Sequence, residues 1–365
     1  MVELARFVGE GRRRVATLGT LAVLAVVTLY GLLRPESLAG VLLGTIFTTN
    51  TLASTLRLSV PIALAALGGI FSEKSGVINI GLEGLLIISA FSAILVAQST
   101  GSLVAGFAGG VLSSVMLAGL FGVVCIEFRA DQIIAGLAVW LIALGLAPFT
   151  ATVIYGQPNV SLTATGTPPT LTELVAPIPV VSGVVTALSE IQFVGALFDA
   201  GVTVYLMFLL VGASWYLLNR TTFGRWVRAS GENPKALDTA GVSVSRVRYV
   251  AVLLSGVLSG LGGAALSLDL AQFGGNGQTM VNGKGFIAIV AYLFGNYNPV
   301  GALLSTTLFA GLDAVQLRLQ TADVIAVPDS LVQTIPFVAV IVVLALVGKT
   351  RLPEAAGEHY ESGEE

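Results

Sequence analysis

The chain has 365 residues, of which 55% are hydrophobic and 11% are charged, and its formal net charge is −3. Soluble proteins carry roughly a quarter charged residues, so this composition excludes a soluble globular protein. It also argues against a nucleic-acid-binding protein, which presents a basic face. The length and the 43 glycines are typical of an all-α, polytopic membrane bundle, with about ten spans of about 20 residues each.

The chain has one cysteine, Cys125, and one histidine, His359. An intrachain disulfide is therefore impossible. Because zinc and similar metals are held by groups of His and Cys ligands, we expect no metal site of that kind. A Ser/His or Cys/His catalytic pair has no base inside the apolar part of the chain, so we expect no catalytic residue.

The first predicted span is the apolar run 15–33, which follows Arg12, Arg13 and Arg14. Since no small-residue cleavage site follows this run, we interpret it as a retained span and not as a cleaved signal peptide. Further predicted spans lie near 51–70, 82–98, 102–126, 132–154, 200–219, 249–270, 284–297, 299–317 and 331–348. The transmembrane domain is therefore predicted over 15–348, with ten spans.

Lysine and arginine in the loops predict the orientation of the bundle. The connection 155–199 contains neither residue, whereas the loop 220–248 is rich in them. Because cytoplasmic loops carry the excess of positive charge, we expect 220–248 to be cytoplasmic and 155–199 to lie outside. The N-terminal segment 1–14 and the tail 349–365 are then both cytoplasmic, which an even number of spans allows.

Two polar segments have no clear fold in the sequence. The outer loop 155–199 is rich in Pro, Thr, Val and Gly, and it could form a small cap or a lateral helix. The tail 352–365 is short and acidic, so we expect it to be disordered and without a role.

The segment "FSEKSGVINIGLEGLL", 71–86, places polar residues between two apolar runs. Its glycines make a continuous helix unfavourable: Gly76, Gly81 and Gly84. Non-helical backbone at membrane depth survives only against protein or a water-filled cavity, and polar residues held there are usually functional. Glu73 and Lys74 are compatible with an ordinary cytoplasmic turn in solvent. Asn79 and Glu83 lie deeper in the apolar pattern, and we expect them to line a substrate pathway.

A second interrupted segment, 273–304, lies in the other half of the chain. Paired broken segments point to a substrate path near the midplane of a transporter. Four polar side chains could bind a polar solute: Gln272, Asn276, Asn282 and Asn296. Phe273 and Phe286 could stack on a ring. Alternatively, 271–283 is an outer loop that faces water, and the two segments share no residue-level repeat.

Two glycine-rich stretches resemble nucleotide-binding motifs without matching them. "GQTMVNGKG", 277–285, lacks the spacing and the Ser or Thr of a phosphate loop. "GLGGAA", 260–265, lies inside a predicted span with no strand before it, so close helix packing explains it better. We therefore expect no bound ATP and no cofactor.

The loop 220–248 contains a short predicted helix. Asn233 and Pro234 can begin it, and Gly241 can end the segment 234–240. Such a helix could dock a partner in the cytoplasm, and a plain basic loop is the alternative.

Three stretches together resemble a known family: "GGIFSEKSGVINIGLEGLL" (68–86), "RASGENPKALDTAGVSV" (228–244) and "NGKGFIAIVAYLFGNYNPVGALL" (282–304). They are similar to the signature regions of the membrane permease subunits of bacterial and archaeal ABC importers in the ribose/branched-chain amino acid permease group. The closest similarity is to the nucleoside-type permeases. The resemblance covers roughly residues 50–348 and keeps the order of the three regions.

This resemblance implies a ten-helix permease of the cytoplasmic membrane that is not itself an enzyme. It would assemble with ABC ATPase subunits, which hydrolyse ATP, and with an extracytoplasmic substrate-binding lipoprotein. The "NIGLEG" form resembles the shorter of two permeases, so a heterodimer with a second, non-identical permease is expected. By the same resemblance, the residues that dock on the ATPase are Gly231, Glu232, Asn233, Pro234, Ala236, Ala240 and Gly241.

The function that the resemblance implies is nucleoside import. A neutral solute of this kind requires hydrogen-bonding groups along its path and no fixed countercharge, which suits Asn79. A permease for a simple sugar such as ribose is the alternative within the same architecture. An ion-coupled secondary transporter, with Glu83 as a proton or sodium site, is the alternative from another class.

Overall fold

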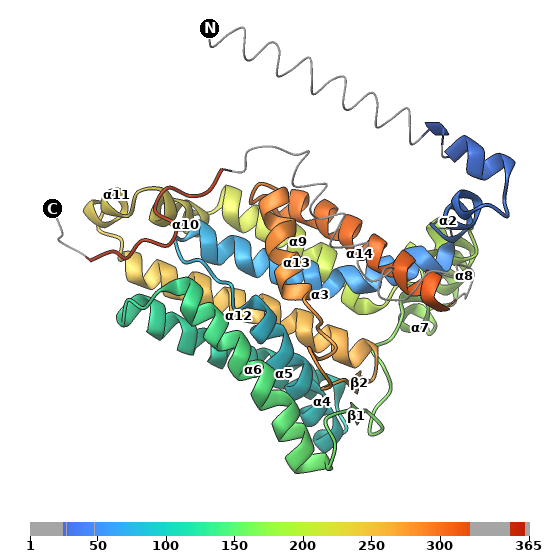
Figure 1. Ribbon diagram of the computed structural model, residues 1–365, viewed down its shortest axis with the longest axis horizontal. Helices are drawn as coiled ribbons and strands as arrows, with labels where there is room; N and C mark the ends of the chain where they lie inside the picture. Colours follow the sequence, from blue (N-terminus) through green and yellow to red (C-terminus); the bar gives the residue numbers. More distant parts are fainter. Residues whose placement is uncertain (1–24, 27, 47, 322–350, 362–365) are drawn as a thin grey trace, which may run out of the picture.

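The computed structural model describes residues 25, 26, 28–46, 48–321 and 351–361, and this part of the chain is almost entirely helical (Figure 1). Seven of its helices are long and apolar enough to cross a membrane. They are α3 (Thr49–Lys74), α4 (Leu82–Thr100), α5 (Leu103–Gly122) with the π-helical turn η1 (Val123–Glu127), α6 (Gln132–Tyr155), α9 (Val202–Arg220), α12 (Val244–Asp269) and α14 (Pro299–Thr321). The protein is thus a polytopic helical membrane protein.

The observed helices match seven of the predicted spans, and three spans have other outcomes. The predicted span 15–33 lies mostly, and 331–348 entirely, outside the described residues. The predicted span 284–297 contains a helix that is too short to cross the membrane alone. That helix, α13 (Lys284–Phe294), has 11 residues, so its length is about 16 Å, against a hydrocarbon core of about 30 Å.

Glycines allow α12 to lie at the centre of the bundle, against α3, α4 and α5. A Cβ on Gly260 would lie 2.9 Å from the Cα of Val111, and one on Gly262 would lie 3.0 Å from the carbonyl oxygen of Pro61. At Gly263 a Cβ would clash with the carbonyl oxygen of Leu86. The stretch 260–265 is therefore a helix-packing motif, as the sequence predicts.

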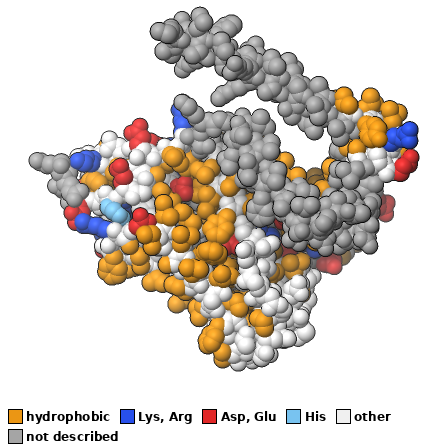
Figure 2. Space-filling view, viewed as in Figure 1, with side chains coloured by type: hydrophobic (Ala, Val, Ile, Leu, Met, Phe, Trp, Pro, Cys, Tyr) orange, Lys and Arg blue, Asp and Glu red, His pale blue; other side chains and the backbone are white. Residues whose placement is uncertain are grey.

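The surface divides into an apolar middle and a charged end. Hydrophobic side chains cover the middle of the visible face, and charged side chains gather at the end that carries α10 (Thr222–Glu232) and α11 (Pro234–Thr239) (Figures 1 and 2). We call this the α11 end. Exposed Met116 on α5 and exposed Leu141 and Phe149 on α6 contribute to the apolar surface. This distribution suits a molecule whose middle faces lipid.

The opposite end, which we call the cap end, contains the connection 155–199. Its elements are β1 (Val160–Ser161), α7 (Leu171–Val175), α8 (Pro179–Ser189) and the 3-10 helix η2 (Val194–Leu197). β1 pairs antiparallel with β2 (Gln272–Phe273), with Val160 opposite Phe273. Nearby in the chain, α2 (Leu38–Ile46) precedes α3. Of the two alternatives from the sequence, the structure has the small cap.

The tail departs from its predicted disorder over the described residues 351–361. Ala355 N donates to the carbonyl oxygen of Gly231 (2.8 Å), and Gly357 N donates to that of Gly76 (3.0 Å). The prediction is wrong here because composition does not register backbone hydrogen bonds to residues more than a hundred positions away.

Candidate functional site

The break between α3 and α4, residues 75–81, is irregular backbone packed inside the protein. Gly76 adopts φ 97°, a conformation that glycine accepts without strain. Side chains satisfy much of its backbone: Ser72 Oγ donates to Val77 O (2.7 Å), and Ile78 N donates to Gln132 Oε1 on α6 (2.7 Å). Buried irregular backbone with such partners is what the membrane interior permits.

This break lies along α12 and leads toward the middle of the bundle. Gly76 lies against the guanidinium of Arg248, whereas Asn79 Nδ2 donates to Ser255 Oγ (3.2 Å). Arg248 and Ser255 are seven residues apart on α12, and this separation corresponds to a rise of roughly 10 Å. Asn79 is therefore held within the bundle, and its Oδ1 also accepts from Gly81 N (3.0 Å).

The second broken segment meets the first at Glu83, in the first turn of α4. One carboxylate oxygen accepts from Gly283 N (2.7 Å) and the other from Gly285 N (2.6 Å). These amides belong to the N-terminus of α13, where orphan N–H groups and the helix dipole favour an anion. Glu83 is 1% exposed, so its charge is stabilised by α13 and not by water. The structure thus brings Glu83 together with the region of Asn282 and Phe286.

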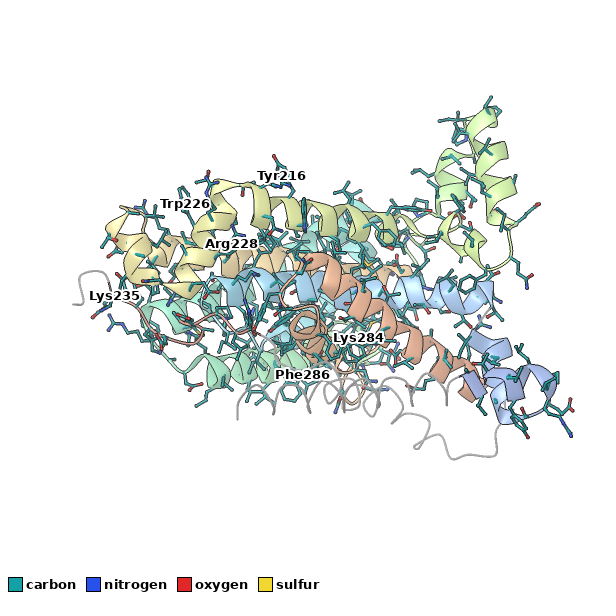
Figure 3. All side chains as sticks on the ribbon, turned by 90° about the horizontal axis from the view of Figure 1, so that it is seen from above. Tyr216, Trp226, Arg228, Lys235, Lys284 and Phe286 are labelled. Atoms are coloured by element: carbon teal, nitrogen blue, oxygen red, sulfur yellow. The ribbon has the colours of Figure 1, made fainter. Side chains whose placement is uncertain are left out.

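Lys284 adds a cation beside this contact. It is buried, and its Nζ donates to Val281 O (3.3 Å). Lys284 and Phe286 lie near the middle of the long axis of the molecule, away from the end where Lys235 lies (Figure 3). Phe286 packs edge-on against Trp140 of α6, with ring centroids 5.4 Å apart. In this conformation the predicted stacking residue Phe286 contacts α6.

The other predicted pathway residues lie elsewhere. Phe273 is fully buried and packs edge-on against Phe91, 5.3 Å between centroids. Gln272, Asn276 and Asn282 are exposed, and Gln272 forms part of β2. This arrangement agrees with the alternative that 271–283 faces solvent at several positions.

Asn296 lies at the α11 end, away from the predicted pathway residues near Glu83. It follows α13, is exposed, and its Oδ1 accepts from Arg351 N (3.2 Å). It also lines a small surface pocket with Lys74 and Arg228. The structure therefore separates Asn296 from Asn79 and Glu83.

Glu73 is not in solvent, contrary to the simple turn considered from the sequence. It is 5% exposed and accepts hydrogen bonds from the hydroxyls of Tyr292 and Tyr297, the latter at 2.7 Å. The partners are more than 200 positions from Glu73, so no local pattern could have revealed them. Lys74 lies partly buried, 5.8 Å from the ring centroid of Tyr297.

A cavity of about 280 Å³ at the cap end was not predicted. Its polar walls include Arg57 of α3, Asp199 and Asp269, with Thr203 Oγ1 donating to Asp269 (2.8 Å). Arg57 is an exposed cation on a helix that crosses the membrane. A lone arginine inside the predicted span 51–70 was a signal available in the sequence.

The predicted coupling segment forms the helix pair α10 and α11, and the expected helix 234–240 is confirmed as Pro234–Thr239. Asn233 caps α11 by accepting from Ala236 N (3.0 Å), and Gly241 (φ 79°) follows it. The segment lies at the charged end of the bundle, where Trp226, Arg228 and Lys235 are labelled (Figure 3). Most of the predicted coupling residues are exposed there: Glu232, Asn233, Ala236, Ala240 and Gly241.

The helix pair is fastened directly to the break between α3 and α4. Ser230 Oγ donates to Ser75 O (2.7 Å). Gly231 is buried, and a Cβ there would clash with the carbonyl oxygen of Lys74. Gly231 therefore acts in packing α10 on α3, whereas Pro234, partly buried, begins α11.

Comparison with known proteins agrees with this architecture. Residues 51–347 match the family described as branched-chain amino acid transport system, permease component. The guanosine ABC transporter permease protein NupQ of Bacillus subtilis is 34% identical over 85% of this chain and 96% of its own length. The nucleoside ABC transporter permease protein NupC of Lactococcus lactis is 33% identical over 84% of this chain and 95% of its own length.

A third relative, from Haloferax volcanii, is provisionally named a glucose ABC transporter permease protein. It is 33% identical over 78% of this chain and 82% of its own length. No solved structure matches the chain significantly. The long apolar helices, the two broken segments and these similarities lead to one conclusion: the chain belongs to the family of ABC transporter permease components and is a multi-pass membrane translocation subunit, not an enzyme.

Proposed function

We propose that this permease imports nucleosides, and that the α11 end is cytoplasmic and the cap end outside. The support for the substrate is the similarity to permeases named for guanosine and for nucleosides. The support for the orientation is the charge of loop 220–248 and the absence of Lys and Arg from 155–199. With the two undescribed apolar runs as the first and last spans, and the interrupted segment that contains α13 counted as the eighth, the proposed total is ten spans, and an even number puts both termini on the cytoplasmic side.

One observation carries the mechanism: the coupling helices are bonded to the irregular segment that holds Asn79 and leads to Glu83. Ser230 and Gly231 of α10 contact the backbone of Ser75 and Lys74. When the ATPase subunits bind ATP and close, a displacement of α10 and α11 shifts the break. Glu83 then carries the displacement to α13 through its two amide bonds. Because packed interfaces are bistable, this produces discrete inward-facing and outward-facing states.

The proposed solute path runs from the cavity lined by Arg57 and Asp269 toward Asn79 and the N-terminus of α13. A neutral polar solute exchanges its water for hydrogen bonds to fixed polar groups along such a path. The exposed residues Gln272 and Asn276 belong to its entrance at the cap end, and exposed Asn282 lies farther along the path, next to the N-terminus of α13. Phe273, Phe286 and Asn296 contribute only in a conformation other than this one.

The hydrogen bonding of Glu83 disfavours the ion-coupled alternative. Both carboxylate oxygens already accept backbone N–H groups, so the carboxylate has a role in fixing α13 that requires no bound ion. The carboxylate is better suited to holding α13 in place.

The proposed complex contains this permease, a second non-identical permease, ABC ATPase subunits and an extracytoplasmic substrate-binding lipoprotein. The exposed face of α11, with Ala236 and Ala240, is the ATPase contact, and the cap with α7 and α8 is the side toward the lipoprotein. The apolar surface of α5 and α6 contacts lipid or the second permease.

A simple sugar is the second candidate substrate, and two observations favour it. Among the residues that the structure describes, those that line the cavity at the cap end include no aromatic side chain on which a nucleobase could stack. The Haloferax relative is provisionally named for glucose.

Uptake in a deletion strain decides between the two substrates. Cells that lack the gene, with and without a plasmid copy, are supplied with labelled uridine, adenosine, ribose or glucose. Nucleoside import predicts that the plasmid restores uridine or adenosine uptake and that unlabelled ribose does not compete. Restoration of ribose or glucose uptake alone would contradict it.

A further inference from the structure

Residues 351–361 form an ordered segment that crosses the α11 end of the bundle, and we call them the C-terminal strap. The strap is the dark red trace beside α10 and α11 in Figure 1. Pro353 and Ala355 are buried in its path. A segment that buries its own side chains and exchanges backbone hydrogen bonds with the bundle is part of the fold.

One set of contacts joins the strap to the coupling helices. Ala355 N donates to the carbonyl oxygen of Gly231 (2.8 Å), in the last turn of α10. Tyr360 Oη donates to Asp238 Oδ2 on α11 (3.0 Å). The strap therefore contacts both helices of the pair that carries the proposed ATPase contact.

A second set joins the strap to the break between α3 and α4 and to α12. Gly357 N donates to Gly76 O (3.0 Å), and a Cβ on Gly357 would lie 3.1 Å from Ile78 Cδ1. Arg248 of α12 is 5% exposed, and its Nη1 donates to the carbonyl oxygen of Glu358 (2.8 Å). Gly76 and Ile78 lie just before Asn79, so the strap contacts the segment that leads to the proposed path.

The two ends of the strap are also fixed. Arg351 N donates to Asn296 Oδ1 (3.2 Å), beyond the end of α13. Glu361 forms a salt bridge with Arg129, in the turn between η1 and α6. Between these ends, within 11 residues, the chain contacts α10, α11, the break between α3 and α4, and α12.

We propose that the C-terminal strap is a positioning element of the coupling machinery. It ties the last turn of α10 to Gly76, so that a displacement of the coupling helices reaches the break by a second connection besides Ser230 and Gly231. The two backbone hydrogen bonds come from Ala355 and Gly357, which are separated by one residue. Because these residues are too close in sequence to move independently, the strap can transmit a displacement from one contact to the other. The proposal rests on the proposed function, since it assigns the strap to ATP-driven transport.

The test is the amount of solute transported per ATP hydrolysed by the complete complex in vesicles. One variant ends the chain after Leu352, and a second, Gly357→Val, strains the backbone at φ 83° and places a side chain against Ile78. The matched control is His359→Gln, an exposed neighbour within the strap. A purely structural role would lower the amount of complex, or both rates together, and would leave their ratio unchanged.

We expect both strap variants to retain ATP hydrolysis. The amount of solute transported per ATP hydrolysed should fall roughly fivefold or more, which is the lower end of the range of coupling between two sites. The control retains the wild-type ratio. An unchanged ratio in assembled strap variants would overturn the proposal. Should neither variant assemble, hydrogen exchange of the wild-type complex decides: rapid, unprotected exchange at Ala355 and Gly357 would overturn it, and protection would support it. Absence of ATP-dependent uptake by the wild-type complex would instead refute the proposed function.

Discussion

At the scale of single residues, the sequence identified the polar groups near the middle of the bundle better than those at the α11 end. Asn79 and Glu83 stood out because they follow glycines inside an apolar pattern, and both are buried as expected. The sequence of Glu73 and its neighbours is compatible with an ordinary turn in solvent, but the structure shows that Glu73 is buried as well. Its tyrosine partners come from another part of the chain, and only the tertiary structure brings them to it.

Glu83→Gln tests the contact between the two broken segments. The amide oxygen of Gln can accept only one of the two N–H groups well, and its NH₂ opposes the other. Hydrogen bonds to a charged group contribute about 1.5–3 kcal/mol each, so we expect uptake to fall about tenfold while the protein still assembles with the ATPase. The measurement is the initial rate of uptake per assembled complex in vesicles. Wild-type uptake by Glu83→Gln would remove this contact from the mechanism.

At the scale of elements, helix positions followed from apolar length, but the half-helix α13 did not. Its apolar run looks like a short span, and its true beginning depends on Gly283 (φ 81°) and on the Glu83 carboxylate. By contrast, α11 was predictable in detail, since Asn233, Pro234 and Gly241 are local capping signals. The strap was not predictable and the cap was only one of two alternatives, because long-range hydrogen bonds order both segments.

The packing of α12 against α4 gives a prediction with a matched control. Gly263→Ala puts a methyl group against the carbonyl oxygen of Leu86, whereas Gly145→Ala on α6 meets no atom within 4 Å. Overpacking costs about 1–3 kcal/mol. We expect Gly263→Ala to lower the thermal unfolding midpoint of the detergent-solubilised protein and Gly145→Ala to leave it unchanged. Equal midpoints for both variants would contradict the observed packing.

The exposed face of α11 is testable as the ATPase contact. Ala236→Asp adds a charge on that face without disturbing the buried Leu237, and Ser245→Asp adds the same charge at an exposed position on the first turn of α12. We expect Ala236→Asp to reduce uptake about tenfold or more, which is the effect of altering an interface residue that contributes much of the binding energy. Ser245→Asp should have little effect. Copurification of the ATPase with each variant gives the readout. Undiminished copurification and uptake with Ala236→Asp would exclude α11 as the contact.

At the scale of the whole molecule, composition and loop charge predicted a polytopic bundle and its orientation. The bundle is observed, and the orientation stays a prediction. Composition sets the class because the hydrocarbon core admits few charges. Composition says little about depth, so it did not show that the helix within the predicted span 284–297 has only 11 residues.

Cysteine labelling tests the orientation. The native Cys125 is buried, so it should contribute little background. Gly166→Cys in the cap should react with a membrane-impermeant maleimide on intact cells, because Gly166 is exposed. Lys235→Cys on α11 should react only after the cells are permeabilised. The reverse pattern would show that the assignment of the two ends is wrong.

The central claim is that an ATPase binds α10 and α11, and that its ATP-dependent movement displaces the broken helices near Asn79 and Glu83. The most direct measurement is solute accumulation by vesicles that contain the complete complex, with simultaneous assay of ATP hydrolysis and with ionophores present to abolish ion gradients. We predict accumulation that requires ATP hydrolysis and persists in the presence of ionophores. Accumulation that proceeds without ATP hydrolysis and collapses with the ion gradient would contradict the account.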